Sequence, residues 1–344
     1  MTNMTPVSAA VAPSPPALDD DLRALLRLAI REDMGTQGSG GDRTVELSIP
    51  EDHRSSALIV ARKGGVLAGG FLLRTLLRQY DPRLNCALLV PDGSALVAGQ
   101  AIAKVSGPTR GLLSAERVML NFLGHLCGIA TLTARYVTAV ATRLDPQAPG
   151  FRPELHPTPH TLQPTPYSPP AICDTRKTTP GFRRLDKYAV RCGGGVNHRL
   201  GLYDGVMLKD NHLAALRQRL GTSLSLRELC QRIRQELPPA IPLWLEVDTL
   251  EQLAEALPLG PGAPGADIIL LDNFTIPQLG QAVVRRRERI PSAAGSSIWP
   301  QLEASGGVTL ENIRAVAETG VDRISIGALT HSAPVLDVAM DLET

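Results

Sequence analysis

The pattern of apolar and polar residues changes halfway along the chain. After residue 170, six continuous apolar runs of strand length follow one another: PAICDT, DGVMLKD, PLWLEVDT, ADIILLDN, WPQLEAS and DRISIGA. Helical segments such as LEQLAEAL, TIPQLGQAVVRRRER and TLENIRAVAETG lie between most of them. Apolar strands that alternate with helices predict a parallel sheet covered on both faces. Six such units in about 170 residues predict an α/β barrel or a partial barrel, with an open doubly wound sheet as the alternative.

The first half has a mixed pattern. The segment DDDLRALLRLAIRED repeats apolar residues at helical spacing and places acids at its start, so it predicts a helix. From Arg54 to Ser106, short β-prone runs are broken by turns. Residues 114–144 predict one long helix, capped by Ser114 and broken near Gly128.

These patterns predict five segments. Residues 1–17, rich in Ala, Pro and Ser, are expected to form a disordered tail, and residues 18–144 an N-terminal domain that ends in a linking helix. The stretch 145–171 contains nine prolines, so we expect 145–170 to be a surface insertion. Residues 171–330 would form the barrel, and 331–344 a C-terminal helix that packs back on the N-terminal domain.

Charge is concentrated in one window. From Asp174 to Lys209 there are eight Arg or Lys residues and three Asp, a balance of +5, whereas the whole chain is +1. Three of the five lysines in the chain also fall in this window. A near-neutral chain argues against a general nucleic-acid binder, and the local charge suits a small anionic ligand.

Cysteine usage and hydropathy predict the compartment. Five scattered cysteines without a C-x-x-C pair indicate reduced thiols, and neither a disulfide framework nor a zinc site. The start of the chain lacks the pattern of a signal peptide, and no apolar run reaches the length of a membrane span. We therefore expect a soluble cytoplasmic protein without a membrane partner.

Each predicted barrel strand ends in a polar group or a glycine: Arg176 and Lys177, Lys209, Glu246, Asp272, Ser305, and Gly327. The carboxyl ends of parallel barrel strands converge on the active site. The two glycine loops, 305–307 and 327–328, stand after the last two strands and fit a phosphate site made of backbone N–H groups and helix N-termini. Glu246 and Asp272 offer the oxygen ligands that magnesium prefers, which it binds largely through waters and substrate phosphates.

Several of these residues have simpler explanations. Arg183, Arg184, Lys187 and Arg191 recur at helical spacing, which favours a solvated helix face. Glu246 could pair with a neighbouring cation, and Asp272 and Asn273 could cap the helix that opens at Thr275. His125 lies in an apolar helix, which favours packing, and the cysteines are expected to be inert. For Arg176, Lys177, His198, Arg199 and Lys209, at strand ends or beside glycines, function is the favoured interpretation.

The residues from Asp174 to His212, DTRKTTPGFRRLDKYAVRCGGGVNHRLGLYDGVMLKDNH, closely resemble the signature of the quinolinate phosphoribosyltransferases, also called carboxylating nicotinate-nucleotide pyrophosphorylases. Further matches follow the family's order: REDMG with GDRT, SAERVMLNFLGHLCGIAT, LEVDTLEQL, ILLDNF, and EASGGVTLENIRAVAETGVDRISIGALTHS. The resemblance covers Leu18 to Leu342 apart from insertions around 147–170, in GTQGSGG and in PSAAGSSIW. No expected site residue is substituted.

The resemblance implies an N-terminal α/β sandwich and an open, incomplete TIM-like α/β barrel. It also implies phosphoribosyl transfer from phosphoribosyl pyrophosphate to quinolinate with Mg²⁺, giving nicotinate mononucleotide, pyrophosphate and CO₂ for de novo NAD synthesis. The rival interpretations are a relative that uses nicotinate without decarboxylation and a non-catalytic binding protein on the same fold.

The resemblance also implies residue roles. Lys177, Arg199, Lys209, Glu246 and Asp272 would be catalytic, with Glu246 and Asp272 near the ribose and, indirectly, the metal. Arg117 would reach the site of the neighbouring subunit, so a homodimer would be the smallest working unit. Substrate binding would involve the following set: Arg117, Thr175, Arg176, Lys177, His198, Arg199, Lys209, Glu246, Asp272, Ser305, Gly306, Gly307, Gly327 and Ala328.

Overall fold

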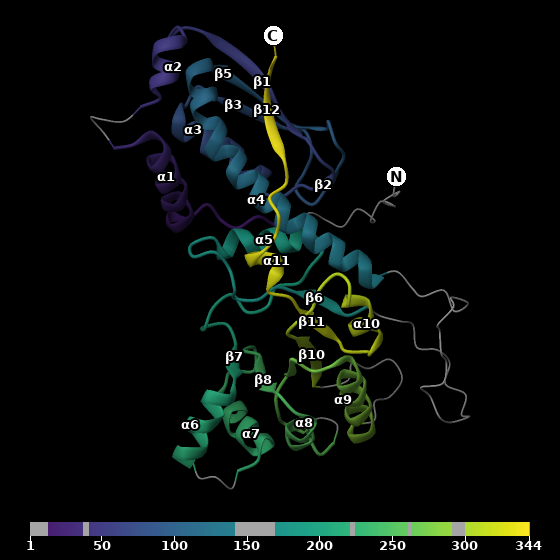
Figure 1. Cartoon of the computed structure of the whole chain (residues 1–344). Coiled ribbons are helices and arrows are strands. Elements are labelled where there is room, and N and C mark those ends of the chain that lie inside the picture. Colours follow the sequence, from purple (N-terminus) through teal and green to yellow (C-terminus); the bar gives the residue numbers. More distant parts are fainter. Residues whose placement is uncertain are drawn as a thin grey trace, which may run out of the picture. The chain divides into compact units, whose positions relative to one another are not determined.

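A computed structural model of the chain describes residues 13–36, 41–141, 169–220, 224–260, 263–290 and 300–343 (Figure 1). Most of the predicted tail and nearly all of the predicted proline-rich insertion lie outside these ranges. The chain divides into two compact units. Unit 1 takes Met1–Ala134, Lys177–Asn197 and Gly327–Thr344, and unit 2 takes Arg135–Arg176 and His198–Ile326.

Unit 1 is built on an antiparallel sheet of four strands in the order β12-β1-β5-β3. A separate two-stranded ribbon pairs β2 with β4. The strands are β1 Arg54–Ala61, β2 Gly65–Val66, β3 Asn85–Leu88, β4 Ala95–Leu96, β5 Ala101–Pro108 and β12 Val338–Glu343. The sheet contributes Ala57, Ile59 and Val105 to the core, all at 0% exposure.

The helices of unit 1 include α3, which contacts both α1 and β3. They are α1 Asp20–Met34, α2 Arg43–Ser48, α3 Gly70–Tyr80, α5 Arg183–Cys192 and α11 Ala328–His331, with most of α4 Thr109–Ala141. The predicted first helix is confirmed: the Asp19 side chain accepts the N–H of Leu22 as its cap, and Leu22 and Leu26 bury its apolar face.

Helix α4 corrects two predictions. It begins at Thr109, and the Ser114 hydroxyl donates to Asp42 Oδ2 at 3.0 Å, so Ser114 is not the cap. The helix also continues through Gly128. A Cβ at Gly128 would lie 2.1 Å from the carbonyl oxygen of Pro334, so glycine is needed there because a later segment of the chain crosses the helix closely.

The end of the chain corrects a third prediction. Residues 331–344 do not form a helix: α11 ends at His331, and β12 pairs antiparallel with β1 from Ser56–Glu343 to Ala61–Val338. The sequence VAMDLE alternates apolar and polar residues over most of its length, a strand period, and six residues are too few for a stable isolated helix. Glu343 also reaches Lys104 of β5, at 2.7 Å.

Unit 2 contains a parallel sheet of six strands in the order β6-β11-β10-β9-β8-β7. The strands are β6 Ala171–Cys173, β7 Val206–Leu208, β8 Leu243–Val247, β9 Ile268–Asp272, β10 Gln301–Ser305 and β11 Arg323–Ser325. From β7 to β11, strands that are successive in sequence are neighbours, and the last strand, β11, pairs with the first, β6, as in a barrel. Within the described residues, only β6 and β7 fail to pair, so the barrel is open there. The prediction of an incomplete barrel is therefore confirmed.

The helices of unit 2 are α6 Asp210–Leu220, α7 Leu226–Glu236, α8 Leu250–Ala256, α9 Ile276–Arg289 and α10 Ile313–Glu318. Helices α7, α8, α9 and α10 contact one another in chain order. Among the described helices of both units, none is long and apolar enough to cross a bilayer.

Candidate active site

The carboxyl ends of the unit 2 strands carry most of the predicted site residues. Thr175 and Arg176 follow β6, Lys209 follows β7, Glu246 lies in β8, Asp272 ends β9 and Ser305 ends β10. The register places Ser305 directly beside Asp272. At the amino ends of the strands the charges are already paired, because Asp267 accepts from Arg234 and Asp322 accepts from Arg286. The two edges of the barrel therefore differ: structural pairs lie at one and candidate ligand groups at the other.

Lys209 and Glu246 form an ion pair at the carboxyl edge. Lys209 Nζ lies 2.5 Å from Glu246 Oε2, and their side chains are 42% and 15% exposed. The interpretation that Glu246 pairs with a neighbouring cation is thus confirmed. Because the lysine is partly exposed, the pair remains accessible to a ligand at this edge.

Arg176 and Arg199 bring two positive charges close together. The pKa of the Arg199 guanidinium is lowered, first by burial and then by the positive charge of Arg176. Arg199 Nη1 donates to the carbonyl of Gly205 at 2.8 Å. Arg176 Nε is buried and has no hydrogen-bond partner among the described residues. Two partly buried cations that repel each other form a site suited to an anion.

His198 directly precedes Arg199 in the chain and is only 6% exposed. Its backbone N–H donates to Asp174 Oδ1 at 2.8 Å, and its Nδ1 accepts the backbone N–H of Arg199 at 2.8 Å. The ring stacks on Trp244 with a centroid distance of 4.6 Å. Its other nitrogen, Nε2, lies 3.5 Å from Glu303 Oε1.

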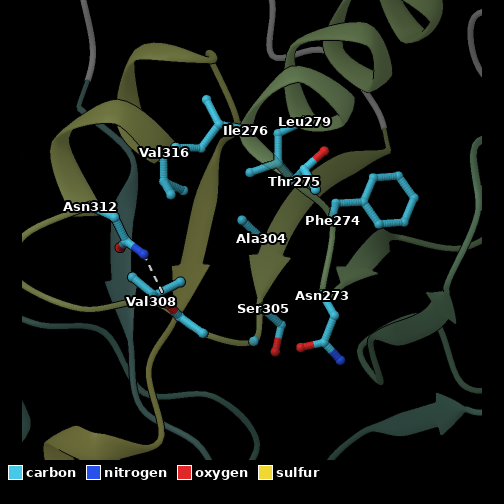
Figure 2. Close-up of a pocket in the computed structure, with 12 residues that line it drawn as sticks. Asn273, Phe274, Thr275, Ile276, Leu279, Ala304, Ser305, Val308, Asn312 and Val316 are labelled. Carbon is cyan, nitrogen blue, oxygen red and sulfur yellow. Dashed lines mark hydrogen bonds between the residues drawn. The ribbon is translucent and has the colours of Figure 1, made fainter.

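The Ser305–Gly307 loop lines a pocket of about 260 Å³ (Figure 2). Gly306 and Gly307 have φ values of +90° and +62°. The Asn312 side chain closes the loop by donating to the carbonyl of Gly307 at 2.9 Å. Helix α10 begins only at Ile313, so the helix N-terminus expected to contribute to this phosphate site lies several residues beyond the loop. The cradle is made by the loop itself.

Asn273 lines the same pocket, directly after Asp272 at the end of β9. Helix α9 begins at Ile276 with Thr275 as its cap, and Gln278 completes a capping box, so the capping explanation for Asp272 and Asn273 is wrong. Asn273 has φ +53°, and its N–H donates to the carbonyl of Ser305 at 2.9 Å. Figure 2 shows the Asn273 and Ser305 side chains near each other at one end of the pocket. Asn273 thus holds the glycine loop, a role that sequence reasoning missed.

The other predicted site residues belong to unit 1. Lys177 is exposed, and its carbonyl accepts the Thr330 hydroxyl at 2.8 Å. A Cβ at Gly327 would lie 3.0 Å from Lys177 Cδ, so Lys177 and the Gly327–Ala328 turn are neighbours. Ala328 opens the short helix α11, as the sequence predicted.

Arg117 is exposed on α4 and lines a pocket of about 580 Å³ together with His125 and Phe182. His125 Nε2 lies 2.8 Å from Asp186 Oδ1, whose side chain is fully buried. The ring also meets Phe182 edge to face at 5.5 Å. Packing alone is therefore an incomplete account of His125.

The basic helix α5 contradicts the prediction of a solvated face at Lys187, whereas Arg184 is exposed as expected. Lys187 is 1% exposed. Arg184 pairs with Asp19, and Arg191 donates to the carbonyl of Ser14 at 3.0 Å. Arg184 and Arg191 therefore hold the segment before α1, which the charge pattern could not indicate.

The five cysteines are free and buried. Burial raises the pKa of Cys127, Cys192 and Cys230 to about 12, so their reactive thiolates are scarce at neutral pH. No group of three or more His, Cys, Asp or Glu side chains in the described ranges could hold a metal ion by itself.

Comparison with known proteins places this arrangement in a family. Residues 42–127 match the family described as "Quinolinate phosphoribosyl transferase, N-terminal domain", and residues 163–341 match its C-terminal domain. The chain is 39% identical over 321 residues to the Bacillus subtilis "Probable nicotinate-nucleotide pyrophosphorylase (carboxylating)", covering 93% of each chain. It is 38% identical to the "Nicotinate-nucleotide pyrophosphorylase (carboxylating)" of Mycobacterium leprae, covering 94% of this chain and 98% of that one.

A solved structure supports the same conclusion. The crystal structure of NadC from Streptococcus pyogenes superposes with a TM-score of 0.76 at 31% identity, covering 96% of this chain and 99% of that one. The chain belongs to the quinolinate phosphoribosyltransferase family.

Proposed function

We propose that the chain transfers the phosphoribosyl group of phosphoribosyl pyrophosphate to quinolinate and releases pyrophosphate and CO₂, leaving nicotinate mononucleotide. Family membership supports the reaction. The observation in this chain that best supports the reaction is the proximity of Arg176 and Arg199. A dianionic ligand would offset the unfavourable free energy of burying two guanidinium groups that repel each other.

The acid substrate would bind to these cations. Quinolinate carries two carboxylates on a planar ring, and a guanidinium fork matches a carboxylate in two parallel hydrogen bonds. Lys177 and Lys209 would supply compact charges for the pyrophosphate or the reacting ring. Nicotinate has one carboxylate fewer and would leave one cation without a partner, so the site favours quinolinate.

The donor substrate would bind along the neighbouring strands. Ser305, Gly306 and Gly307 would receive the 5′-phosphate, because a glycine loop at the end of a barrel strand exposes its backbone N–H groups to an anion. Gly327 and Ala328 would add donors at the start of α11, and Thr175 would lie near the acid substrate. Asp272 and Glu246 would hold the ribose hydroxyls.

The reaction would proceed by attack of the quinolinate nitrogen on the anomeric carbon as pyrophosphate leaves. The new C–N bond forms while the C–O bond to pyrophosphate breaks, through an oxocarbenium-like state. Positioning and charge stabilisation by the chain's cations would supply most of the rate. The C2–carboxylate bond then breaks, the cationic ring takes up the electron pair, and a proton replaces CO₂ at C2.

Mg²⁺ fits this site as a partner of the substrate. Two carboxylates, Glu246 and Asp272, face the carboxyl edge, and magnesium commonly binds one or two carboxylates together with substrate phosphates and waters. Glu246 is already paired with Lys209, which leaves Asp272 as the stronger candidate. The ion would neutralise charge on the pyrophosphate. Asp272→Asn is expected to raise the Mg²⁺ concentration required for half-maximal rate, and an unchanged requirement would remove Asp272 from the metal's surroundings.

Arg117 would act across a homodimer interface. Arg117 belongs to unit 1, whereas the strand ends that carry most of the other site residues belong to unit 2, and Arg117 lines a pocket of unit 1. The test is complementation between two inactive variants, Arg117→Ala and Arg199→Ala. If Arg117 serves the partner's site, mixed dimers contain one intact site, and reassorted mixtures should recover about a quarter of the wild-type rate. Mixtures that stay inactive although dimers exchange would place Arg117 in its own subunit's site.

The function is tested by offering quinolinate and nicotinate separately to the purified chain with phosphoribosyl pyrophosphate and Mg²⁺. Nicotinate mononucleotide from quinolinate alone is the expected result. Turnover of nicotinate would favour the non-decarboxylating relative. Binding of quinolinate without turnover of either acid would favour a binding protein.

A further inference from the structure

A buried charged cluster lies inside the barrel of unit 2. It consists of His198, Glu303 and Arg323, whose side chains are 6%, 0% and 14% exposed. Glu303 lies in strand β10 between Leu302 and Ala304, which are apolar and buried. Burial of a carboxylate costs free energy even when it is paired, so such a residue is weak evidence for stability alone.

The hydrogen bonds around His198 determine which ring nitrogen carries the proton. Nδ1 accepts the backbone N–H of Arg199 at 2.8 Å. A backbone N–H can only donate, so Nδ1 must present a lone pair, and the proton of the neutral ring lies on Nε2. Nε2 is 3.5 Å from Glu303 Oε1.

Glu303 is held so that it faces this proton. Its Oε2 accepts from Arg323 Nε at 2.9 Å. Within the described residues its other oxygen, Oε1, makes no hydrogen bond, and it points toward His198. A separation of 3.5 Å is long for a hydrogen bond, and such contacts in ligand-free sites often shorten when the substrate binds.

The ring is also fixed from its face. Trp244 stacks on it at 4.6 Å with an interplanar angle of 27°. A Cβ at Gly205 would lie 2.6 Å from the Trp244 ring, and the carbonyl of Gly205 accepts Nη1 of Arg199 at 2.8 Å. The Arg199 backbone and guanidinium are therefore both tied to the surroundings of His198.

We propose that Glu303 is a positioning residue for the reaction. Together with Arg323 it holds His198 as the Nε2–H tautomer, and Nδ1 of that ring fixes the backbone from which Arg199 reaches the acid substrate. This inference rests on the proposed function, because it assumes that Arg199 binds quinolinate. Glu303 itself has no exposed side-chain surface to offer a substrate, so it would act only through His198.

The kinetic test uses Glu303→Gln, which keeps the shape and removes the charge. The KM for quinolinate should rise at least about tenfold, the effect of losing one charge-assisted hydrogen bond, while the KM for phosphoribosyl pyrophosphate changes by less than about threefold. The matched control is Glu318→Gln, which breaks the exposed Arg314–Glu318 pair of the same unit and should change neither KM. A folded Glu303→Gln variant with an unchanged quinolinate KM would overturn the proposal, as would a fall in kcat alone.

A second pair of variants keeps the buried ion pair intact. In His198→Asn, Oδ1 falls near the position of Nδ1 and can accept the next residue's N–H, as Asp210 Oδ1 does for Asn211 at 2.7 Å. In His198→Gln, the amide reaches toward the position of Nε2 instead. Both variants lose the ring, but the Asn variant should keep a quinolinate KM at least about tenfold lower than that of the Gln variant. A lower quinolinate KM in the Gln variant than in the Asn variant would show that Nε2, and not Nδ1, is the ring nitrogen that matters for quinolinate binding, and it would overturn the proposal.

A third readout does not depend on activity. In protein labelled with ¹⁵N in the imidazole rings, the His198 signals are those lost in His198→Asn. They should show a protonated Nε2 and an unprotonated Nδ1, and Glu303→Gln should allow the other tautomer to appear. A protonated Nδ1 in the wild type would overturn the inference whatever the activity. The expected tautomer in a protein that does not turn over quinolinate would instead count against the proposed function.

Discussion

The Ser305–Gly307 loop allows a sharp test, because its two glycines have similar backbones and different surroundings. Gly306 has φ +90°, and a Cβ there would lie 2.1 Å from Asn273 Oδ1 and 3.1 Å from the Asn273 nitrogen. Gly307 has φ +62°, and a Cβ there would meet nothing within 4 Å. Gly306→Ala and Gly307→Ala therefore share the cost of a left-handed backbone, but only Gly306→Ala forces Asn273 to move.

The magnitudes follow from these contacts. An L-residue in the left-handed region costs about 1–2 kcal/mol, which is the full expectation for Gly307→Ala. Gly306→Ala should lose about 2 kcal/mol more, because Asn273 must leave its position and weaken the 2.9 Å hydrogen bond to the carbonyl of Ser305. For a unit of the size of unit 2, each kcal/mol lost from the free energy of unfolding lowers the Tm by about 2–4 °C.

Thermal unfolding of the two variants measures the difference. The Tm of Gly306→Ala should fall by about 6–16 °C and that of Gly307→Ala by about a third to a half as much. The double variant Gly306→Ala/Asn273→Gly should recover part of the loss, because it removes the clashing oxygen and glycine tolerates the φ of +53° at that position. Equal losses for the two single variants, or no recovery in the double variant, would refute the account of the loop.

Three further predictions follow from the described contacts. Arg199→Lys keeps the positive charge but loses the planar guanidinium, so the KM for quinolinate should rise about 10–100-fold in initial-rate assays. A change below about threefold would contradict the proposal that Arg199 binds a carboxylate of quinolinate. Burial raises the pKa of the thiols of Cys127, Cys192 and Cys230 to about 12, so iodoacetamide at pH 8 should label them in urea but not in the native protein. Rapid labelling of the native protein, seen by mass spectrometry, would contradict their burial. Deleting residues 338–344 removes β12 and exposes the edge of β1. The Tm should therefore fall, and size-exclusion chromatography should show more aggregate. An unchanged Tm would mean that the pairing of β12 with β1 adds no stability.

The barrel was predictable from the sequence because its strands are apolar on both faces. The runs around Ile172, Leu245 and Ile269 carry no alternation, and their strand length together with the helical segments between them indicates a sheet covered on both sides. The polar residues that end these runs, such as Lys209 and Asp272, could therefore be assigned to one edge of the sheet from the sequence alone.

Features that depend on contacts between distant segments were not predictable. The period of residues 338–343 suits a strand, but the partner that makes it one, β1, lies some 280 residues earlier. Lys187 has the same helical spacing as its exposed neighbours, and only the packing of α5 shows that it is buried. Gly128 looked like a helix break because the chain that crosses it, at Pro334, is far away in sequence.

His198 shows the same limit within the site. Its position near the glycines and the family resemblance predicted a substrate ligand. The tautomer of its ring depends on a hydrogen bond from the next residue and on a carboxylate 105 positions later. The one signal in the sequence was Glu303 itself, a charged residue in the middle of an apolar strand. Such a residue is a better indicator of a buried network than of a surface.

The most direct test of the central claim is the fate of the C2 carboxylate of quinolinate. With quinolinate labelled at that carbon, phosphoribosyl pyrophosphate and Mg²⁺, the purified chain should release labelled CO₂, pyrophosphate and nicotinate mononucleotide in equal amounts. Label retained in a nucleotide product, or product formed from nicotinate and not from quinolinate, would contradict decarboxylating phosphoribosyl transfer at this site.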